Sequence, residues 1–288
     1  MESCDNILTV DCEEWFVAET LSGKISHQDW DALPSTVEKN SHRLLNLFNK
    51  YHLKATWFML GWVASKFPYL VREIEGEGHE IACHSYGHRR VDLMSKEEFY
   101  EDTIRAVEAI VRATNNKPIG YRAPSWSINK TSAWAFDILS EIGFEYDSSV
   151  FPIKHDIYGV PDGPCHTVKL KSSSNRIFYE VPASTFKLFG KNIPIAGGGH
   201  FRHSPLWYSK MIINMMNKKG HPAMVYIHPW ELDPDPPKIS GLSRLQRFRM
   251  YGSTSLLEYK FDKLLSSYQF TPIMNFIQQL KRRQIGFR

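Results

Sequence analysis

Short apolar runs alternate with amphipathic segments along most of the chain. Runs rich in apolar or β-branched residues predict strands at residues 7–10, 55–60, 80–83, 119–121, 178–181 and 223–227. Between them, apolar positions recur every three or four residues and predict helices at residues 41–51, 95–112, 131–142 and 206–219. Ser95 and Glu98 form a capping box at the start of the second helix, and Gly143 and Gly220 follow the last two.

This alternation of strands and helices favours an α/β fold with a parallel sheet, open or closed into a barrel. A length of 288 residues fits a single domain, residues 1–288. We expect its functional motifs within residues 7–232 and a C-terminal helical extension over about residues 241–288. Two segments rich in Gly, Pro, Ser or Asp predict loops, at residues 153–175, where a short hairpin fits, and at residues 233–240.

Polar residues follow four of the predicted strands. Asp11 follows the first strand, His84 the third, Arg122 the fourth and His228 the last. The carboxyl ends of parallel strands meet at one edge of a sheet or barrel, and active sites of such folds lie there. The four residues are therefore expected to form one site.

His84 and His88 stand four residues apart, and Gly87 between them permits a tight turn or the start of a helix. Two imidazoles at this spacing can hold one divalent cation together with a carboxylate. The spacing alone leaves open two surface histidines, or two histidines that form hydrogen bonds in the core.

Asp11, Glu13 and Glu14 place three carboxylates directly after an apolar strand, with Cys12 among them. Like charges crowded at one place are costly unless a cation or an arginine neutralises them, although a helix N-terminus is an alternative partner. If the extended backbone continues, Asp11 and Glu13 project to one side, and Cys12 and Glu14 to the other.

Arg122 and His228 complete the set of strand-end residues. A guanidinium at Arg122 can orient a carboxylate or lower its pKa through a bidentate pair, whereas an ordinary structural ion pair is the alternative. His228 ends a strand too apolar to be exposed, so its imidazole is expected at the active face. Considered singly, it also fits a buried histidine with hydrogen bonds.

Composition narrows the class of protein. The net charge of +4 results from 35 basic and 31 acidic residues, which is too even a balance for a nucleic-acid tract. No apolar stretch approaches the roughly 18 residues of a membrane span, and the N-terminus lacks the pattern of a signal peptide. The cysteines have no CxxC spacing and fit reduced thiols of a cytoplasmic protein: Cys4, Cys12, Cys83 and Cys165.

One basic cluster stands near the C-terminus, at Lys281, Arg282 and Arg283. A solvated terminal helix is the favoured interpretation, and a tail that rests on an anionic membrane surface is the alternative. The sequence is also compatible with a homo-oligomer.

Four motifs in order, from residue 7 to residue 232, resemble the polysaccharide deacetylase family, also called the NodB-homology fold or carbohydrate esterase family four. They are Thr9-Val-Asp11 with its nearby acids, His84-x-x-x-His88, Arg122-x-Pro124 and Ile227-His228. Three further segments resemble the exopolysaccharide-locus deacetylases that act without an export signal: Tyr146-Asp-Ser-Ser149, Gly197-Gly-Gly-His-Phe-Arg202 and Arg247-Phe-Arg-Met-Tyr251.

The resemblance implies a distorted (β/α) barrel, a divalent ion of the Zn²⁺ type and hydrolysis of the acetamido group of N-acetylhexosamines. Asp11 then corresponds to the catalytic base, Arg122 to the residue that tunes it, and His228 to the general acid. His84 and His88 correspond to metal ligands. The family usually places a second Asp next to the base, where this chain has Cys12.

The third metal ligand is therefore predicted to be Glu13, two positions after the base, with Glu14 and Cys12 as alternatives. A cysteine thiolate would favour zinc over harder ions.

Four more residues are predicted to contact the substrate. Trp126 and Trp230 are expected to line the acetyl pocket or stack on a sugar, with core packing as the alternative. The backbone N–H near Ser125 corresponds in the resemblance to a second oxyanion donor, and Asp147 ends another strand.

The predicted function is thus a metal-dependent N-deacetylase that acts on N-acetylhexosamine units of a surface glycan, an exopolysaccharide or its precursor. The alternatives are a cyclic imide or ureide amidohydrolase of the same fold, and a glycan-binding module whose metal site has decayed. Cys12 is the only support for that last alternative.

Overall fold

The computed structural model describes residues 5–155, 158–188, 190–195 and 197–285. Its main sheet has the strand order β10-β1-β2-β3-β4-β5-β7-β6, and β11 also pairs with β1. The strands of this sheet are β1 (Asn6–Cys12), β2 (Thr56–Met59), β3 (Glu80–Cys83), β4 (Gly120–Tyr121), β5 (Tyr146–Asp147), β6 (Val168–Lys171), β7 (Ile177–Glu180), β10 (Met224–Ile227) and β11 (Phe270–Thr271). A separate antiparallel pair consists of β8 (Thr185–Leu188) and β9 (Lys191–Pro194).

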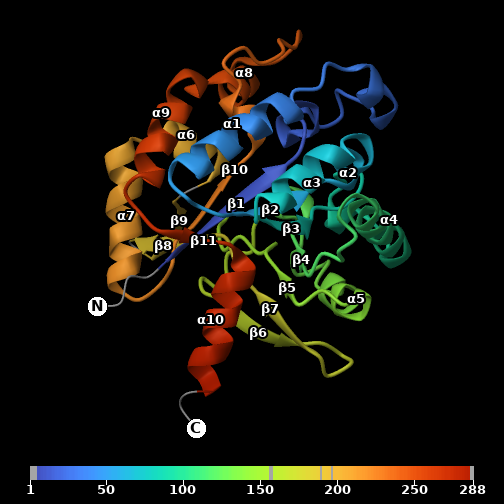
Figure 1. The fold of residues 1–288 in the computed structure, drawn as a ribbon, viewed down its shortest axis with the longest axis vertical. Helices are drawn as coiled ribbons and strands as arrows, with labels where there is room; N and C mark the ends of the chain where they lie inside the picture. Colours follow the sequence, from blue (N-terminus) through green and yellow to red (C-terminus); the bar gives the residue numbers. More distant parts are fainter. Residues whose placement is uncertain (1–4, 156–157, 189, 196, 286–288) are drawn as a thin grey trace.

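Neighbouring strands of the main sheet run parallel from β10 to β7, and only β6 is antiparallel to its neighbour. The sheet curls into a half-barrel (Figure 1), and within the described residues no pairing joins its two ends, β10 and β6. Strand β1, which pairs with β10, β2 and β11, is buried along its whole length, as expected for a parallel strand with both faces covered.

Helices α1 to α5 follow one another around the outer side of the sheet, and α7 stands at the opposite end, beside β8 and β9 (Figure 1). The α-helices are α1 (Val37–Lys50), α2 (Gly61–Lys66), α3 (Pro68–Gly76), α4 (Lys96–Thr114), α5 (Ala135–Ile142), α6 (Gly198–His203), α7 (Leu206–Lys218), α8 (Arg244–Tyr251), α9 (Thr254–Leu265) and α10 (Ile273–Ile285). Short 3₁₀ helices are η1 (Trp15–Val17), η2 (Glu19–Leu21), η3 (His27–Ala32), η4 (Val91–Leu93), η5 (Pro124–Trp126) and η6 (Pro229–Leu232).

Local signals in the sequence account for the helix ends that were predicted. At the start of α4, the Ser95 hydroxyl accepts from the Glu98 N–H, and the Glu98 carboxylate accepts from the Ser95 N–H. Helix α5 ends at Gly143, whose φ of 105° is left-handed. All six predicted strands and all four predicted helices are present.

Several elements were not predicted, because their sequences carry short or irregular patterns. They include α2, α3, α6 and the β8–β9 pair. The predicted loop at residues 153–175 ends in the hairpin of β6 and β7, and residues 233–240 form a loop between η6 and α8. The expected C-terminal helical extension contains α8, α9 and α10, but also β11, which joins the main sheet beside β1.

The triple glycine at residues 197–199 has a packing role. A side chain on Gly197 would lie 1.9 Å from the ring of Tyr226, so only glycine fits between this ring and the chain that leads into α6. The backbone of Gly197 also bridges to Tyr226 of β10. The glycines thus bring α6 close to the strand that carries His228.

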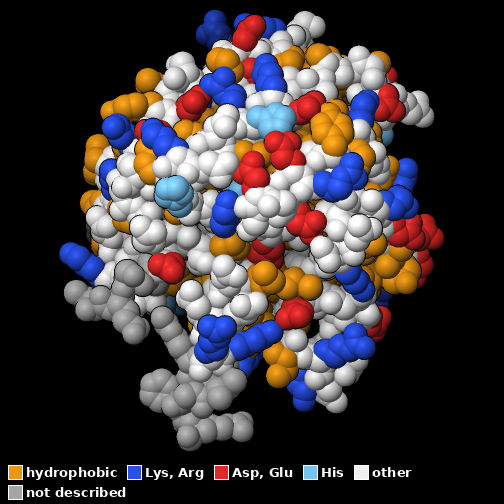
Figure 2. Space-filling model, viewed as in Figure 1, with side chains coloured by type: hydrophobic (Ala, Val, Ile, Leu, Met, Phe, Trp, Pro, Cys, Tyr) orange, Lys and Arg blue, Asp and Glu red, His pale blue; other side chains and the backbone are white. Residues whose placement is uncertain are grey.

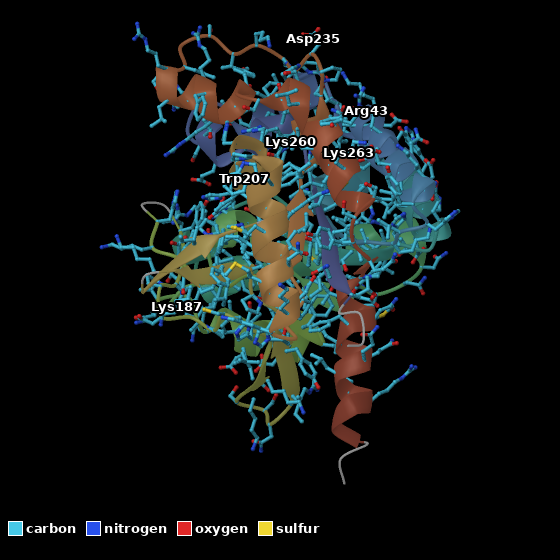
Figure 3. The ribbon with its side chains drawn as sticks, turned by 90° about the vertical axis from the view of Figure 1, so that its left-hand side faces the viewer. Arg43, Lys187, Trp207, Asp235, Lys260 and Lys263 are labelled. Carbon is cyan, nitrogen blue, oxygen red and sulfur yellow. The ribbon has the colours of Figure 1, made fainter. Side chains whose placement is uncertain are left out.

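The surface shows mixed charge. On the face drawn in Figure 2, basic and acidic side chains alternate, and hydrophobic side chains lie in small groups. In the view of Figure 3, α7 faces the viewer with the exposed Trp207 near its upper end, and Lys260 and Lys263 lie on α9. None of the helices in the described ranges is long and apolar enough to cross a membrane.

Candidate metal and catalytic site

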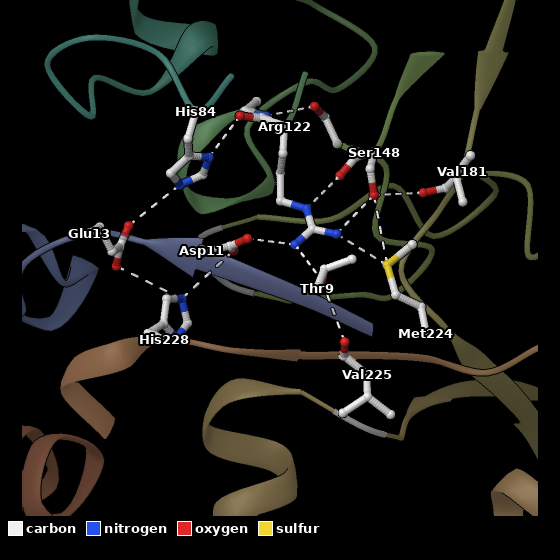
Figure 4. A network of polar contacts seen from close by, with 12 residues as sticks. Thr9, Asp11, Glu13, His84, Arg122, Ser148, Val181, Met224, Val225 and His228 are labelled. Carbon is white, nitrogen blue, oxygen red and sulfur yellow. Dashed lines mark hydrogen bonds and ion pairs between the residues drawn. The ribbon is translucent and has the colours of Figure 1, made fainter. Parts of the chain in front are cut away.

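The strand-end residues predicted to form one site do lie together (Figure 4). Asp11 is the sixth residue of β1, and Glu13 directly follows that strand. His84 directly follows β3, Arg122 follows β4, and His228 follows β10. Because these four strands are parallel, their carboxyl ends meet at one edge of the sheet.

Glu13, His84 and His88 form the one cluster of potential metal-binding side chains found in the described ranges, with ligand atoms all within 4.8 Å of one another. Glu13 Oε2 lies 3.4 Å from His84 Nε2 and 2.8 Å from His88 Nε2. Burial raises the pKa of Glu13, but His88, His228 and His84 outweigh it and hold that pKa well below its usual value. The carboxylate is therefore ionised.

The residues present fit a divalent cation. Glu13 Oε2 is buried and has no hydrogen bond of acceptable geometry, although two imidazole nitrogens face it. A buried carboxylate oxygen without a donor is costly, and a bound cation would satisfy it. Two His and one carboxylate form a donor set typical of zinc sites with open coordination positions.

The backbone fixes both histidines. His84 Nδ1 lies 2.8 Å from the carbonyl oxygen of Arg122, so we assign the proton to Nδ1 and leave the Nε2 lone pair directed at Glu13. His88 has a φ of 52°, and its backbone N–H donates to the Ser85 hydroxyl at 3.1 Å. This left-handed backbone turn places the His88 imidazole next to that of His84, with 5.4 Å between the ring centres.

The two alternatives for the third ligand point elsewhere. Glu14 accepts hydrogen bonds from the backbone N–H groups of Thr36 and Val37, at the start of α1, and from the Ser35 hydroxyl. Cys12 Sγ lies 3.8 Å from the Ser41 hydroxyl, and burial raises the pKa of the thiol. Both side chains thus project away from His84, as the alternation of strand residues predicts.

Asp11 is bound to the buried guanidinium of Arg122, with 2.5 Å between Asp11 Oδ1 and Arg122 Nη1. The second carboxylate oxygen, Oδ2, lies 3.8 Å from His228 Nε2. Arg122 therefore holds one carboxylate oxygen of Asp11. The other oxygen faces His228.

Arg122 is fully buried, and every nitrogen of its guanidinium has a partner. Besides Asp11, it donates to the Thr9 hydroxyl and to the hydroxyl and carbonyl of Ser148. Its guanidinium carbon also lies 3.9 Å from the ring centre of Phe58 and 4.7 Å from that of Trp126. These contacts fix the arginine, and through it Asp11.

His228 is held by a carboxylate that the sequence interpretation missed. Its Nδ1 lies 2.9 Å from Glu231 Oε2, and its backbone N–H donates to the same oxygen. Burial lowers the pKa of His228, but the carboxylates of Glu13, Glu231 and Asp11 outweigh it and raise the pKa to about 9. The imidazole is therefore protonated at neutral pH, with Nε2 directed at Asp11.

Glu231 itself is paired with the buried Arg202 of α6, at 3.5 Å. Arg202 in turn donates to the carbonyls of Arg249 and Met250 at the end of α8. The spacing of His228 and Glu231 could have revealed the first contact, because three residues make one turn of a 3₁₀ helix. The contact with Arg202 depends on the packing of α6 and leaves no local signal.

The four residues predicted to contact the substrate lie in different surroundings. Trp230 donates from Nε1 to Glu13 Oε1 at 3.3 Å and stacks on His228, so it borders the site. Trp126 is buried between Phe151 and Tyr226, which is the core packing left open above.

Ser125 and Asp147 are both engaged with other side chains. Ser125 has a φ of 53° and donates its hydroxyl to Glu19 at 2.6 Å. Asp147 is fully buried and accepts from the backbone and hydroxyl of Ser149, whose hydroxyl accepts from the N–H of Ala123. In this arrangement Asp147 supports the turn that follows Arg122 and has no surface open to a sugar.

A cavity of about 380 Å³ opens beside His88. Its lining includes Glu19, Trp30, Arg90 and Leu93, but not Asp11 or His228. The cavity thus borders the metal-binding cluster at His88. His228 does not line this cavity, although 18% of its side chain is exposed.

Comparisons with known proteins agree with this geometry. Residues 19–146 match the family model described as polysaccharide deacetylase, and residues 148–278 match a second model described as a domain of unknown function, DUF3473. A peptidoglycan deacetylase of Helicobacter pylori is 36% identical over 108 residues, which cover 38% of this chain and 36% of the relative. A peptidoglycan-N-acetylglucosamine deacetylase of Bacillus cereus is 33% identical over 82 residues, 28% of this chain and 30% of the relative.

Solved structures of similar fold cover nearly the whole chain. A protein from Mycobacterium smegmatis whose name assigns it to the polysaccharide deacetylases has a TM-score of 0.61 at 19% identity, covering 97% of this chain and 92% of that one. PuuE allantoinase has a TM-score of 0.57 at 16% identity, covering 92% and 85%. At these identities the likeness concerns the fold alone.

The half-barrel has the NodB-type fold of solved structures that are named as polysaccharide deacetylases. Residues 19–146 of the chain match the polysaccharide deacetylase model, and parts of the chain are similar to peptidoglycan deacetylases. The chain spans about a third of the length of the first curated relatives. Those relatives are named for peptidoglycan, and the exopolysaccharide subgroup stays a prediction.

Proposed function

We propose that the protein is a metal-dependent N-deacetylase that hydrolyses the acetamido group of N-acetylhexosamine units in a surface glycan, an exopolysaccharide or its precursor. One observation carries the proposal. A buried cluster of Glu13, His84 and His88 lies against a paired base, Asp11, and an imidazole donor, His228. These are the groups that metal-assisted amide hydrolysis needs.

Glu13 Oε2 and the Nε2 atoms of His84 and His88 would hold the metal, most simply Zn²⁺ given this donor set. Such an ion, when bound, polarises the amide carbonyl and lowers the pKa of water. The remaining steps belong to side chains of this chain.

Asp11 is placed to accept a proton from the attacking water. Arg122 holds its Oδ1, which leaves Oδ2 free toward the reaction space. The fixed guanidinium keeps the carboxylate in one orientation and compensates its charge at a buried position.

His228 is placed to give a proton to the departing sugar amine. Glu231 binds its Nδ1, so the proton to be donated is held on Nε2, the atom that faces Asp11. The stacked ring of Trp230 limits the rotation of the imidazole. The nearest atoms of base and acid lie 3.8 Å apart, so both groups can border one scissile amide bound beside them.

The decayed-module alternative loses its support in this arrangement. It rested on Cys12 at the position of a usual ligand, but Glu13 supplies a carboxylate to the two histidines instead. The imide-opening alternative shares the fold, as the likeness to an allantoinase shows, and the spacing of Asp11 and Glu13 suits it as well, so the substrate has to separate the two functions.

The direct test measures acetate released from N-acetylglucosamine oligomers, lipid-linked or nucleotide-linked N-acetylated sugars and peptidoglycan fragments. Asp11→Asn and His228→Ala should each lower turnover by about 10²–10⁴-fold while the metal content is retained. Ser173→Ala, in the distant hairpin of β6 and β7, serves as control. Ring opening of cyclic imides without acetate release from any sugar would refute the proposal in favour of the amidohydrolase.

A further inference from the structure

Helix α8 carries apolar side chains that the described residues leave more than half exposed. Leu245 and Phe248 are 58% and 55% exposed, although they stand three residues apart on one short helix. One face of the Phe248 ring stacks on His203 at 4.2 Å. The rest of the ring and the whole end of Leu245 point outward, which is costly in water and typical of a surface that has a partner.

The charged residues next to these two in the sequence are basic. From residue 236 to residue 257 the chain contains Lys238, Arg244, Arg247 and Arg249, and no acidic residue. The three arginines of α8 are exposed. Within the described part of the chain no carboxylate forms an ion pair with any of them, unlike Arg89 or Arg90 near the cavity.

We infer that α8 is a docking surface for an anionic lipid bilayer, with Leu245 and Phe248 inserted between headgroups and Arg244, Arg247 and Arg249 in contact with lipid phosphates. Apolar side chains flanked by arginines are the pattern of helices that lie in a membrane interface. The inference is independent of the reaction proposed above.

The body of the protein holds α8 rigidly in this position. Met250 is buried, and the buried Arg202 donates to the carbonyls of Arg249 and Met250. Gln246 donates to the carbonyl of Thr20, in η2. The outward face is therefore a fixed feature and not the product of a loose segment.

The same contact places α8 beside the cavity. Two residues of η2, Glu19 and Leu21, line the cavity next to His88. A bilayer bound to α8 would therefore lie next to η2, a segment that lines the cavity. The basic cluster at the C-terminus fits a membrane less well, because Lys281 is paired with Glu145 at 2.9 Å.

A lipid surface explains these observations better than other partners. A second copy of the chain needs roughly 800 Å² of complementary surface per partner, far more than two side chains on an eight-residue helix offer. An anionic glycan would pair with the arginines and stack on Phe248, but it would leave the aliphatic Leu245 without a partner.

Flotation of the full chain with vesicles tests the inference. We expect binding to phosphatidylcholine vesicles with 40% phosphatidylglycerol, and little binding to pure phosphatidylcholine. Binding should weaken steeply between about 20 and 300 mM salt, because the Debye length shrinks. The paired variants Arg244→Glu with Arg247→Glu, and Leu245→Ser with Phe248→Ser, should each weaken binding by at least about tenfold.

The matched control is Lys171→Glu with Ile177→Ser, which changes one basic and one exposed apolar residue at the far end of the molecule, in β6 and β7 (Figure 1). Unfolding midpoints and metal content establish that all variants are folded. Equal loss in control and α8 variants, binding without regard to lipid charge, or no binding at low salt would overturn the inference. A dimer or an anionic polysaccharide bound through α8, without vesicle binding, would also overturn it.

Discussion

Glu13 and Glu14 are adjacent carboxylates with different predicted roles, one as a metal ligand and one as a support of the fold. Replacing each of them in a separate variant therefore tests the site. Glu13→Gln removes the charge that faces His84 and His88 but keeps a side chain able to accept from Trp230. Glu14→Ala removes the acceptor of two backbone N–H groups at the start of α1. We expect Glu13→Gln to weaken metal binding, and Glu14→Ala to weaken the fold.

The sizes of the two effects follow from the contacts. Loss of a group that forms a hydrogen bond to a metal ligand typically costs about 10–100-fold in metal affinity, so loss of a ligand itself should cost at least about 100-fold. At a free metal concentration of 100 Kd, the metal stabilises the wild type by about 2.7 kcal/mol, and the same concentration would stabilise Glu13→Gln by only about 0.4 kcal/mol. Glu14→Ala should lose about 1–3 kcal/mol of stability with or without metal.

Urea denaturation with and without added metal measures both quantities on each variant, and competition with a chromophoric chelator gives the affinities. Cys12→Ser is the third variant, and its affinity should equal that of the wild type. Metal binding by Glu13→Gln at wild-type affinity would refute the assignment of the third ligand. A weakened affinity in Glu14→Ala with unchanged stability would refute it as well.

Three further predictions concern single residues. Arg122→Met should lose about 3–5 kcal/mol in urea denaturation, since it leaves the Asp11 carboxylate buried without a partner, and a loss below 1 kcal/mol would count against that pairing. Glu231→Gln should lower kcat about 10–100-fold with little change in KM, because His228 loses its orientation; equal changes in both would indicate a merely structural role. His79 is buried, and burial lowers its pKa from 6.5 to about 4 while Nδ1 accepts from the N–H of Ala55. Below pH 6.5 the unfolded chain therefore binds a proton at His79 that the folded protein does not bind until about pH 4. The free energy of unfolding should fall across this window by up to about 3 kcal/mol. Denaturation of His79→Gln should show a flatter dependence of stability on pH.

The main features of the fold were predictable because they depend on local patterns. The apolar strands and the capped helix at Ser95 are encoded by neighbouring residues, and the position of Asp11, His84, Arg122 and His228 follows from the parallel sheet. The alternation of side chains along β1 also separates Glu13 from Cys12 and Glu14.

What the sequence did not predict depends on contacts between distant segments. Arg202 reaches Glu231 only because α6 packs against β10, where Gly197 lets the ring of Tyr226 approach. Asp147 was expected at the substrate because it ends a strand, but the turn after β5 directs its carboxylate to Ser149. The end of a strand thus predicts the position of a residue in the fold, but the contacts made by the following turn determine the direction of its side chain.

The central claim is that the cluster of Glu13, His84 and His88 holds a metal that hydrolysis of an N-acetyl group requires. The most direct measurement is acetate release from an N-acetylglucosamine oligomer by protein stripped of metal and then titrated with Zn²⁺ and other divalent ions. We predict that stripping abolishes acetate release and that one equivalent of metal per chain restores it, in the wild type but not in His84→Ala. Acetate release that persists unchanged after stripping, or that returns equally in His84→Ala, would contradict the claim.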